Sequence, residues 1–421
     1  MRILLVNKFL YPNGGSETYM FRLGKCLEKH GHIVQYFGME HPDRCVGNAV
    51  QAYTSMMDFH TSNVLVKISY AFRTIYSVEA RKKLRLVLDD LQPDVIHLNN
   101  FNYQLTPSMI VEAIKWKRES GHPCRLVYTA HDFQLICPNH QLFDPTEGKI
   151  CERCMNGGNI RFVNCIKKKC IHASGLRSMI GFCEAYYWNV RKIYDHLDTV
   201  ICPSQFMKEK LDSNPVLAAK TVFLRNFEET ATNDVMDTSV VSKLPERYVL
   251  YFGRFSTEKG IGTLIKAMHA LPEIPFVLAG NGPLLDQVQS IPNVTYVGFL
   301  SGGVLNGVIH HAAFSVIPSE WYENCPYSVI ESLMLCTPVL GAKIGGIPEL
   351  IQDGITGALF RSKDAEDLIR AIKDLWDHPQ RLDTFRENCK AVRFDTVDTY
   401  TQKLIKLYSH TISENGEKTH E

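Results

Sequence analysis

The chain of 421 residues contains no long apolar segment. A helix needs roughly 18 consecutive apolar residues to cross a bilayer, and no stretch reaches that length. The apolar run at residues 3–6 stops at Asn7 and Lys8, which makes it too short for an export signal. We therefore expect neither a membrane span nor a signal peptide.

Strong compositional bias and a fixed-period repeat are also missing. Hydrophobic residues make up 45% of the chain, charged residues 22% and aromatic residues 10%. These values are ordinary for a globular protein and exclude collagen-like, disordered and coiled-coil classes. At about 150 residues per domain, the length predicts two or three domains.

The net charge is close to zero, at +1, but the charges are unevenly spread. Residues 1–225 carry 29 Lys and Arg against 20 Asp and Glu, and residues 226–421 carry 17 against 25. A basic first half can attract an anionic substrate or a membrane surface, although two unlike solvated surfaces would give the same counts. We expect no nucleic-acid partner.

The thirteen cysteines are an odd number, so they cannot all pair in disulfides within one chain. In a chain without an export signal, thiols serve as core residues or metal ligands, because the cytosol is reducing. We therefore expect the protein to work in the cytoplasm.

Short apolar runs alternate with helix-like segments, which predicts parallel sheets covered on both faces by helices. The strands expected in the first half are residues 1–6, 32–37, 94–98 and 125–129, with helices at 16–30 and 107–119. The strands expected in the second half are residues 248–252, 276–279, 295–297, 314–317 and 339–340. The predicted fold class is α/β, with two Rossmann-like domains that face each other across a cleft.

A polar stretch poor in aromatic residues, 228–246, separates the two halves and indicates a linker. The expected domains are residues 1–227, with a cysteine-rich insert at 137–175, and residues 247–394. Residues 395–421 are again helical in pattern and could cross back to the first domain.

Gly253 and Arg254 directly follow a predicted strand, and Lys259 opens the next helix. The two cations can converge with helical N–H groups on one anion, which suits a diphosphate. A solvated turn beside a helix start would show the same residues.

The next predicted strand is followed by Gly280, Asn281, Gly282 and Pro283. Glycines at this position let a planar ligand approach the backbone, and open α/β sheets bind ligands at these strand ends. A simple tight turn is the alternative.

Glu323 and Glu331 lie on either side of a predicted helix start, with seven residues between them. Pro326 suits the first turn of that helix, which places Glu323 in the preceding loop and Glu331 inside the helix. A carboxylate in the loop can accept hydrogen bonds from sugar hydroxyls, and one in the helix can accept them from a ribose diol. Compensation of the helix dipole would explain one such glutamate, but two are harder to dismiss.

Over nearly its whole length the chain resembles the retaining glycosyltransferases of family 4, which have the GT-B fold and bind a nucleotide sugar between two domains. The family's pair of glutamates matches Glu323 and Glu331, and its phosphate-binding cations match Arg254 and Lys259. The residues that the resemblance implies in substrate binding are Gly14, Gly15, Gly253, Gly280, Asn281, Gly282, Pro283, Cys325, Pro326, Tyr327, Ser328 and Glu331.

The resemblance implies catalytic roles for Arg254, Lys259, Glu323 and His131. His131 matches the family's cleft histidine near the transferred sugar, although a His-Asp pair at a strand end is commonly structural. Gly14 and Gly15 match the Gly-rich loop that makes room for the diphosphate and the acceptor. The chain departs from the family at two points: Pro326 replaces a glycine and removes one N–H from the sugar pocket, and Phe227 replaces the glycine that usually follows Asn226.

The cysteine-rich insert contains a candidate metal centre. Its candidate ligands are Cys151, Cys154, Cys165 and Cys170, with Cys137 as an alternative. The paired spacing suits a structural zinc held by four thiolates, and the alternative is that these cysteines are small apolar core residues. We expect no cofactor for catalysis.

Residues 61–91 form one long predicted helix with a basic and an apolar side. Its basic residues are Arg73, Arg81, Lys82, Lys83 and Arg85. Such a helix could make a peripheral contact with anionic lipid, or it could simply cover the first sheet.

The resemblance implies transfer of a hexosyl-type unit from a nucleoside diphosphate sugar, UDP- or GDP-linked, to a hydroxyl acceptor with retention at the anomeric carbon. The charge distribution favours a lipid-linked glycan acceptor in surface polysaccharide synthesis, at the inner face of the membrane. A nucleotide-sugar epimerase of the same fold and a catalytically silent partner subunit that binds nucleotide sugars are the alternatives.

Overall fold

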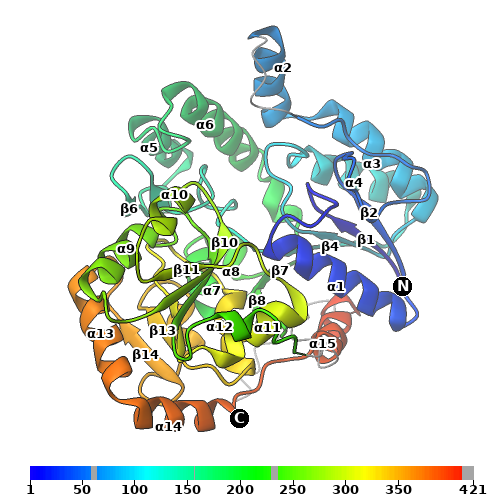
Figure 1. Cartoon of the computed structure of the whole chain (residues 1–421). Helices are drawn as coiled ribbons and strands as arrows, with labels where there is room; N and C mark the ends of the chain where they lie inside the picture. The colour runs from blue at the N-terminus through cyan, green and yellow to red at the C-terminus, as the bar shows by residue number, and fades with distance from the viewer. Residues whose placement is uncertain (58–63, 156, 229–235, 410–421) are drawn as a thin grey trace. The chain divides into compact units, whose positions relative to one another are not determined.

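A computed structural model describes residues 1–57, 64–155, 157–228 and 236–409. It confirms the predicted α/β class, with two six-stranded sheets flanked by helices (Figure 1). A short two-stranded antiparallel hairpin, β5 (Phe143–Asp144) with β6 (Lys149–Ile150), stands apart from both sheets.

The strands of the first sheet are β1 (Arg2–Val6), β2 (Ile33–Phe37), β3 (Val95–Leu98), β4 (Arg125–Thr129), β7 (Thr199–Cys202) and β8 (Thr221–Phe223). Their order is β2-β1-β3-β4-β7-β8, and β1 pairs in parallel with both β2 and β3. The four strands expected in this half are confirmed to within one residue. Of these, β1, β3 and β4 are strongly apolar because strands covered on both faces have no solvent side.

The strands of the second sheet are β9 (Val249–Arg254), β10 (Phe276–Asn281), β11 (Val294–Tyr296), β12 (Phe314–Ile317), β13 (Val339–Ala342) and β14 (Gly357–Phe360). Their order is β11-β10-β9-β12-β13-β14, with parallel pairings. The direction in which strands are added reverses between β9 and β12, and ligands of open α/β sheets bind at such a switch point.

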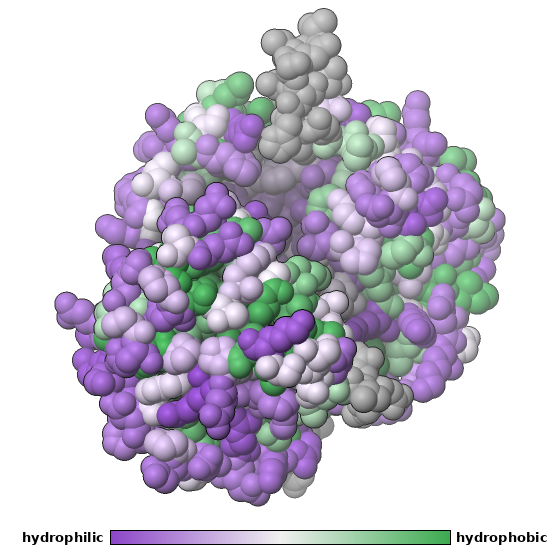
Figure 2. Space-filling model, viewed as in Figure 1, coloured by the Kyte–Doolittle hydropathy of each residue, from purple (hydrophilic) through white to green (hydrophobic). Residues whose placement is uncertain are grey.

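Both faces of the second sheet are packed. Along β9, Val249 and Tyr251 enter one apolar core, whereas Leu250 and Phe252 enter another. This alternation fixes the strand from both sides, so the loops at its carboxyl end start from a rigid base. In the view of Figure 2 most of the exposed surface is hydrophilic, as expected when apolar side chains fill such cores.

Fifteen α-helices lie within the described ranges. Those in the first part of the chain and at its end are α1 (Gly15–Lys29), α2 (Val64–Ile75), α3 (Val78–Leu91), α4 (Ser108–Ser120) and α15 (Val397–Ser409). Those between are α5 (Val163–Lys167), α6 (Gly175–Val190), α7 (Gln205–Asp212), α8 (Pro215–Ala218), α9 (Ile261–Ala270), α10 (Leu285–Gln289), α11 (Gly302–His311), α12 (Tyr327–Met334), α13 (Ala365–Asp377) and α14 (Pro379–Cys389). None of the helices within these ranges has the length and apolar character needed to span a bilayer.

The prediction of one continuous helix over 61–91 is wrong. The helix is interrupted at Tyr76 and Ser77, which separate α2 from α3. The Ser77 hydroxyl accepts a hydrogen bond from the backbone N–H of Ala80 at 3.0 Å and so caps the start of α3. A serine offers this cap only when the backbone leaves the helical conformation. Residues 61–63 of the predicted helix lie outside the described residues.

The chain forms two compact units. One contains Met1–Thr129, Arg191–Ile201 and the described residues from Asp395 onward, and the other contains Ala130–Val190 and Cys202–Phe394. The predicted domains, 1–227 and 247–394, follow the strand pattern rather than these units and stay a prediction. Residues 229–235 of the predicted linker and 410–421 of the predicted C-terminal helix lie outside the described residues.

Helix α15 packs against α1 in the first unit. The hydroxyls of Tyr400 and Tyr19 are 2.8 Å apart, and both are buried. The Tyr408 hydroxyl hydrogen-bonds to Nδ1 of His97 at 2.6 Å, and Nε2 of the same ring bonds to Thr129 at 2.7 Å. The last described helix is therefore held in place by a buried polar network.

Candidate functional site

Glu323 has a buried carboxylate at the centre of a small group of donors. Its Oε1 accepts hydrogen bonds from Lys259 Nζ at 2.7 Å, Ser319 Oγ at 2.7 Å and Trp321 Nε1 at 2.9 Å. Burial alone would raise the pKa of Glu323, but the Lys259 ammonium and these hydrogen bonds outweigh it and hold the pKa below its usual value. Oε2 accepts no hydrogen bond from the described residues, so it remains available to a ligand hydroxyl.

Lys259 and Glu323 meet because β9 and β12 are neighbours in the second sheet. The strands pair through Val249 with Phe314, so the loops that follow them emerge side by side. Gly260 has a left-handed φ of 75°, and a Cβ there would lie 1.8 Å from the carbonyl oxygen of Pro318. Only glycine permits this approach, which brings the Lys259 loop against the Glu323 loop.

Arg254 ends β9 and is exposed to solvent. Its register partner on β10 is Asn281, so the two residues lie next to each other at the carboxyl edge of the sheet. Within the described residues the guanidinium makes no side-chain hydrogen bond or ion pair. An unpaired guanidinium at a switch point is suited to bind an anion.

The glycines predicted at this edge are required by close backbone contacts. A Cβ on Gly280 would lie 1.9 Å from the carbonyl oxygen of Gly253, and one on Gly282 would lie 2.4 Å from that of Phe255. Gly280 and Gly282 also have φ values of 140° and 157°. The loops after β9 and β10 therefore lie directly against each other, and Pro283 follows in the turn before α10.

Helix α12 starts at Tyr327 with Pro326 as its N-cap residue. Glu323 lies in the preceding loop and Glu331 within the helix, which confirms their predicted placement. Cys325 packs its side chain into an apolar cluster, where burial raises the pKa of the thiol to about 12. That thiol therefore does not project toward a ligand, and Tyr327 and Ser328 are only partly exposed.

The loop that follows β13 also holds the Glu323 loop in place. The backbone N–H of Gly346 donates to the carbonyl of Glu323 at 2.8 Å, and a Cβ on Gly346 would lie 1.8 Å from the Asn324 carbonyl. Asn324 in turn accepts a hydrogen bond from Ser204 Oγ and donates one to the Ala130 carbonyl, both at 2.7 Å. The sequence analysis did not identify Asn324 as a site residue. The only indication of it in the sequence is its position directly after Glu323.

Asn324 thus holds Ala130, and His131 is the residue that directly follows Ala130 after the end of β4. His131 therefore starts from a backbone position that is tied to the Glu323 loop. Burial of the ring lowers the pKa of His131 from its usual 6.5 to about 3. The imidazole is therefore neutral at physiological pH. It can hydrogen-bond to a ligand but does not supply a positive charge.

Gly14 and Gly15 lie in the first unit, where Gly15 starts α1 after an extended Gly14. Their loop is tied to the loop after β3: the Lys8 N–H donates to the Asn100 carbonyl at 2.6 Å, and the Asn100 amide donates to Ser16 Oγ at 2.9 Å. The predicted Gly-rich loop therefore follows β1 at the switch point of the first sheet.

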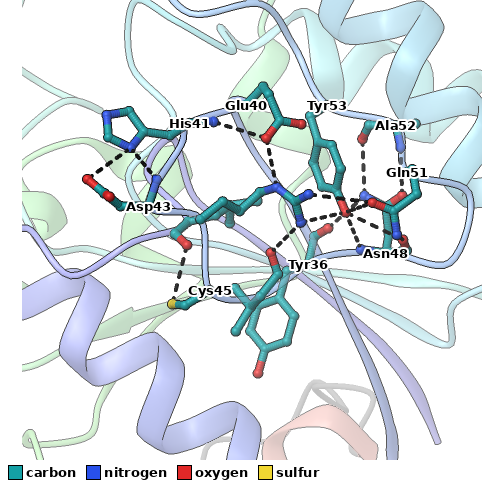
Figure 3. Close-up of polar contacts among 12 residues, drawn as sticks. Tyr36, Glu40, His41, Asp43, Cys45, Asn48, Gln51, Ala52 and Tyr53 are labelled. Carbon is teal, nitrogen blue, oxygen red and sulfur yellow. Dashed lines mark hydrogen bonds and ion pairs between the residues drawn. The ribbon is translucent and has the colours of Figure 1, made fainter.

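The loop after β2 forms a separate polar network, shown in Figure 3. The Arg44 guanidinium lies 3.9 Å from the ring centroid of Tyr53 and hydrogen-bonds to Glu40 at 3.0 Å. His41 from this loop stacks on Tyr11 of the Gly-rich loop, with ring centroids 3.9 Å apart. The sequence analysis missed this network, which orders a second loop at the same sheet edge.

The predicted cysteine ligands are brought together. Cys137, Cys151, Cys154, Cys165 and Cys170 all line one small cavity in the second unit.

Two family models match the chain. One, described as "Glycosyl transferases group 1", covers residues 235–392, and the other, described as "Glycosyltransferase Family 4", covers residues 13–166. The chain belongs to the family 4 glycosyltransferases. The predicted family is thereby confirmed.

Similar proteins match this glycosyltransferase over nearly its full length. An "Uncharacterized 42.6 kDa protein in cps region" from Klebsiella pneumoniae is 23% identical over 97% of this chain and 100% of its own. Sucrose-phosphate synthase from Thermosynechococcus elongatus has a TM-score of 0.67 at 20% identity and covers 96% of this chain and 98% of its own. Anabaena HepE, solved with UDP, has a TM-score of 0.64 at 18% identity and covers 97% and 100%. These likenesses and the two Rossmann-like sheets establish the GT-B fold.

Proposed function

We propose that this glycosyltransferase moves a hexosyl-type unit from a nucleoside diphosphate sugar to a hydroxyl acceptor, with retention at the anomeric carbon. The observation that supports the proposal best is the group formed by Arg254, Lys259 and Glu323 at the carboxyl ends of β9 and β12. Two cations and one carboxylate with a free oxygen match a ligand that joins a diphosphate to a polyhydroxyl ring.

In the proposed reaction Arg254 and Lys259 bind the diphosphate. When the bond between the anomeric carbon and the β-phosphate oxygen breaks, negative charge grows on that oxygen. A preorganised cation at this place can contribute about 3 kcal/mol to transition-state stabilisation. Glu323 fixes the position of the Lys259 ammonium through Oε1 and accepts a hydrogen bond from a sugar hydroxyl through Oε2.

The acceptor hydroxyl attacks the anomeric carbon on the face that the diphosphate leaves. Its oxygen forms the new bond to carbon, and its proton passes to the leaving phosphate oxygen, so no enzymic nucleophile is needed. His131, neutral at physiological pH, borders the anomeric centre as a hydrogen-bonding group. Glu331 would hold the ribose, and the loop at 280–283 would lie against the base.

UDP is the nucleotide to test first, because the similar HepE has been solved with UDP and with UDP-glucose. GDP stays the alternative. The differential shift in thermal unfolding with UDP, GDP and ADP identifies the base, since a ligand at 100 times its dissociation constant stabilises the folded state by about 2.7 kcal/mol.

The proposed acceptor is a lipid-linked glycan of surface polysaccharide synthesis, reached at an anionic membrane. Val78, Lys82 and Leu86 are exposed at four-residue intervals and so share one face of α3. Phe72 of α2 is 71% exposed. A lysine among exposed apolar side chains is the pattern of a peripheral lipid contact.

The basic residues predicted for this contact are only partly available. Arg73 is paired with Glu79, Arg81 with Glu112, and Arg85 with Asp89 and Glu119. Within the described residues Lys82 and Lys83 form no ion pair. We therefore assign the lipid contact to Lys82 and Lys83 and not to the arginines.

The reaction is tested by incubating the protein with the selected nucleotide sugar and a set of lipid-linked acceptors, followed by NMR of the product. Retention of the anomeric configuration supports the proposal, and inversion contradicts it. An altered sugar formed from donor alone would indicate an epimerase. Nucleotide binding without turnover toward any acceptor would indicate a silent partner subunit.

A further inference from the structure

Five of the thirteen cysteines line one small cavity outside the proposed donor site. They come from separate points along residues 137–170. Cys137, Cys154, Cys165 and Cys170 have 1–9% of their surface exposed, and Cys151 is partly exposed.

The backbone turns so that these thiols converge. Lys169 adopts a left-handed φ of 48°, and the N–H of Cys170 then donates to the carbonyl of Cys165 at 3.1 Å. The N–H of Cys151 donates to the carbonyl of Leu142 at 2.8 Å, next to the β5–β6 hairpin. Three stretches of chain are thereby brought to the same cavity.

The insert has little apolar core of its own. Apart from cysteines, the buried hydrophobic residues described within 137–175 are Leu142, Phe143, Met155 and Phe162. A segment with only four buried hydrophobic side chains besides its cysteines gains limited stability from hydrophobic burial, and small segments of this kind commonly rely on a metal.

Among the described residues, no three of the insert sulfur atoms all lie within 4.8 Å of one another. Zinc–sulfur bonds of about 2.3 Å in tetrahedral geometry place sulfur atoms about 3.8 Å apart. Among the described residues, the set with three ligand atoms within 4.8 Å of one another is Cys26, His30 and Asp398, not the insert cysteines. Binding would therefore draw the insert thiols inward.

Cys26, His30 and Asp398 are the weaker candidate. His30 Nε2 and Asp398 Oδ1 already form a 2.8 Å hydrogen bond near the surface between α1 and α15. That pairing accounts for their proximity without a metal.

The insert also contacts the Glu323 loop. Glu152, which lies between Cys151 and Cys154, accepts hydrogen bonds from the Tyr322 hydroxyl at 2.7 Å and from Lys210 Nζ at 2.5 Å. Tyr322 directly precedes Glu323. Its ring also contacts Phe133, which precedes the insert in the chain, with centroids 6.2 Å apart.

We propose that Cys154, Cys165 and Cys170, with a fourth thiolate from Cys151 or Cys137, bind one structural zinc ion that holds Glu152 against Tyr322 and so steadies the donor-binding loop. The metal takes no part in the chemical step. The proposed effect of the zinc ion on the donor-binding loop rests on the proposed function.

Zinc content is measured by elemental analysis of full-length protein expressed with zinc and purified without a metal-affinity tag. About one zinc per chain is expected, together with loss of the metal in Cys154→Ser, Cys165→Ser and Cys170→Ser. The matched control is Cys183→Ser, a partly exposed cysteine of α6 that does not line the cavity, and it should keep its zinc. One of Cys137→Ser and Cys151→Ser should also keep it, which identifies the fourth ligand.

Variants that fail to fold do not decide the question, so wild-type protein is also treated with a strong chelator. Lower thermal stability and faster proteolysis within residues 137–175, both restored by added zinc, are expected. Metal-free protein that takes up no zinc on titration would overturn the proposal. So would an intact mass 2 Da below the all-thiol value in unreduced protein, since that mass shows a disulfide.

The link to the donor loop is tested with Glu152→Gln and Tyr322→Phe, which leave every cysteine in place. Both variants should keep zinc and raise the KM for the sugar donor several-fold with a smaller change in kcat. Unchanged donor kinetics would overturn the link while leaving the zinc site standing. Because zinc content is measured without substrate, failure of the proposed reaction cannot be mistaken for failure of the zinc proposal.

Discussion

Lys259 and Glu323 are 64 positions apart in the chain and form a direct ion pair. The sequence pattern assigned one to phosphate and the other to sugar, and it gave no sign that they touch. The reason is that strand adjacency, not chain distance, brings the loops after β9 and β12 together. As a consequence, removing either charge disturbs the other residue as well as any ligand.

Lys259→Ala is predicted to lower kcat by about 100-fold, because the charge that forms on the leaving phosphate loses a preorganised cation. It should also lower the free energy of unfolding by about 1 kcal/mol, since Glu323 keeps a buried charge without its partner while Lys259 itself is partly exposed. Steady-state kinetics and urea unfolding measure the two effects.

The matched control is Lys266→Ala, an exposed lysine on α9, which should change neither quantity. Lys259→Ala combined with Glu323→Gln should recover the lost stability but not the lost turnover. A single Lys259→Ala variant with wild-type kcat would remove Lys259 from the leaving-group role.

The lowered pKa of His131 predicts a loss of stability in mild acid. The unfolded chain takes up a proton on this ring near pH 6.5, whereas the folded protein resists it until about pH 3. Protons therefore favour unfolding as the pH falls through this window, and above pH 6.5 the effect vanishes. Urea unfolding at pH 7.5 and pH 5 should show a smaller loss for His131→Asn than for wild type.

His269→Asn, at an exposed position of α9, serves as the control and should behave as wild type does. If His131→Asn loses as much stability on acidification as the wild type, the ring is not buried in its neutral form.

At the level of whole elements, the sequence pattern located strands far better than it located breaks and tertiary contacts. Buried strands such as β4 are apolar runs bounded by turn residues, a signal that is complete within five residues. The interruption of the helix before α3 depends on Ser77 acting as a helix N-cap. A serine can take this role, but its presence in a sequence does not require it. Networks such as the one around Arg44 depend on side chains that meet only after the loop has folded.

Helix α15 illustrates a contact that pattern alone cannot show. His97 and Tyr408 are 311 positions apart and hydrogen-bond in the interior of the first unit. Tyr408→Phe is predicted to lower the free energy of unfolding by about 1–2 kcal/mol, because the buried His97 ring loses its hydrogen bond to the Tyr408 hydroxyl. Urea unfolding measures the change.

Tyr186→Phe, on an exposed tyrosine of α6, removes the same hydroxyl and should have almost no effect. Equal stability of Tyr408→Phe and wild type would mean that the His97 contact adds nothing to the docking of α15.

Over the whole molecule, the basic excess in residues 1–225 and the acidic excess in 226–421 give the protein a field that can attract an anionic acceptor toward one part of the chain. Part of that basic charge is locally compensated, as the arginines of α2 and α3 show. On α3, the attraction should therefore depend on Lys82 and Lys83, which form no ion pair among the described residues.

The last prediction follows from screening. Exposed charges interact over about 10 Å at 0.1 M ionic strength and over less as salt is added. Raising the salt concentration should increase the KM for a lipid-linked acceptor several-fold and that for the sugar donor much less, because the donor is bound by close contacts. The double variant Lys82→Gln, Lys83→Gln should reproduce this effect and weaken binding to anionic vesicles. The control double variant Lys243→Gln, Lys266→Gln removes the same amount of charge from exposed positions elsewhere. It should change neither the acceptor KM nor vesicle binding. If the first pair leaves acceptor kinetics and vesicle binding unchanged, α3 presents only a solvated surface, and a neutral, soluble acceptor becomes the better hypothesis.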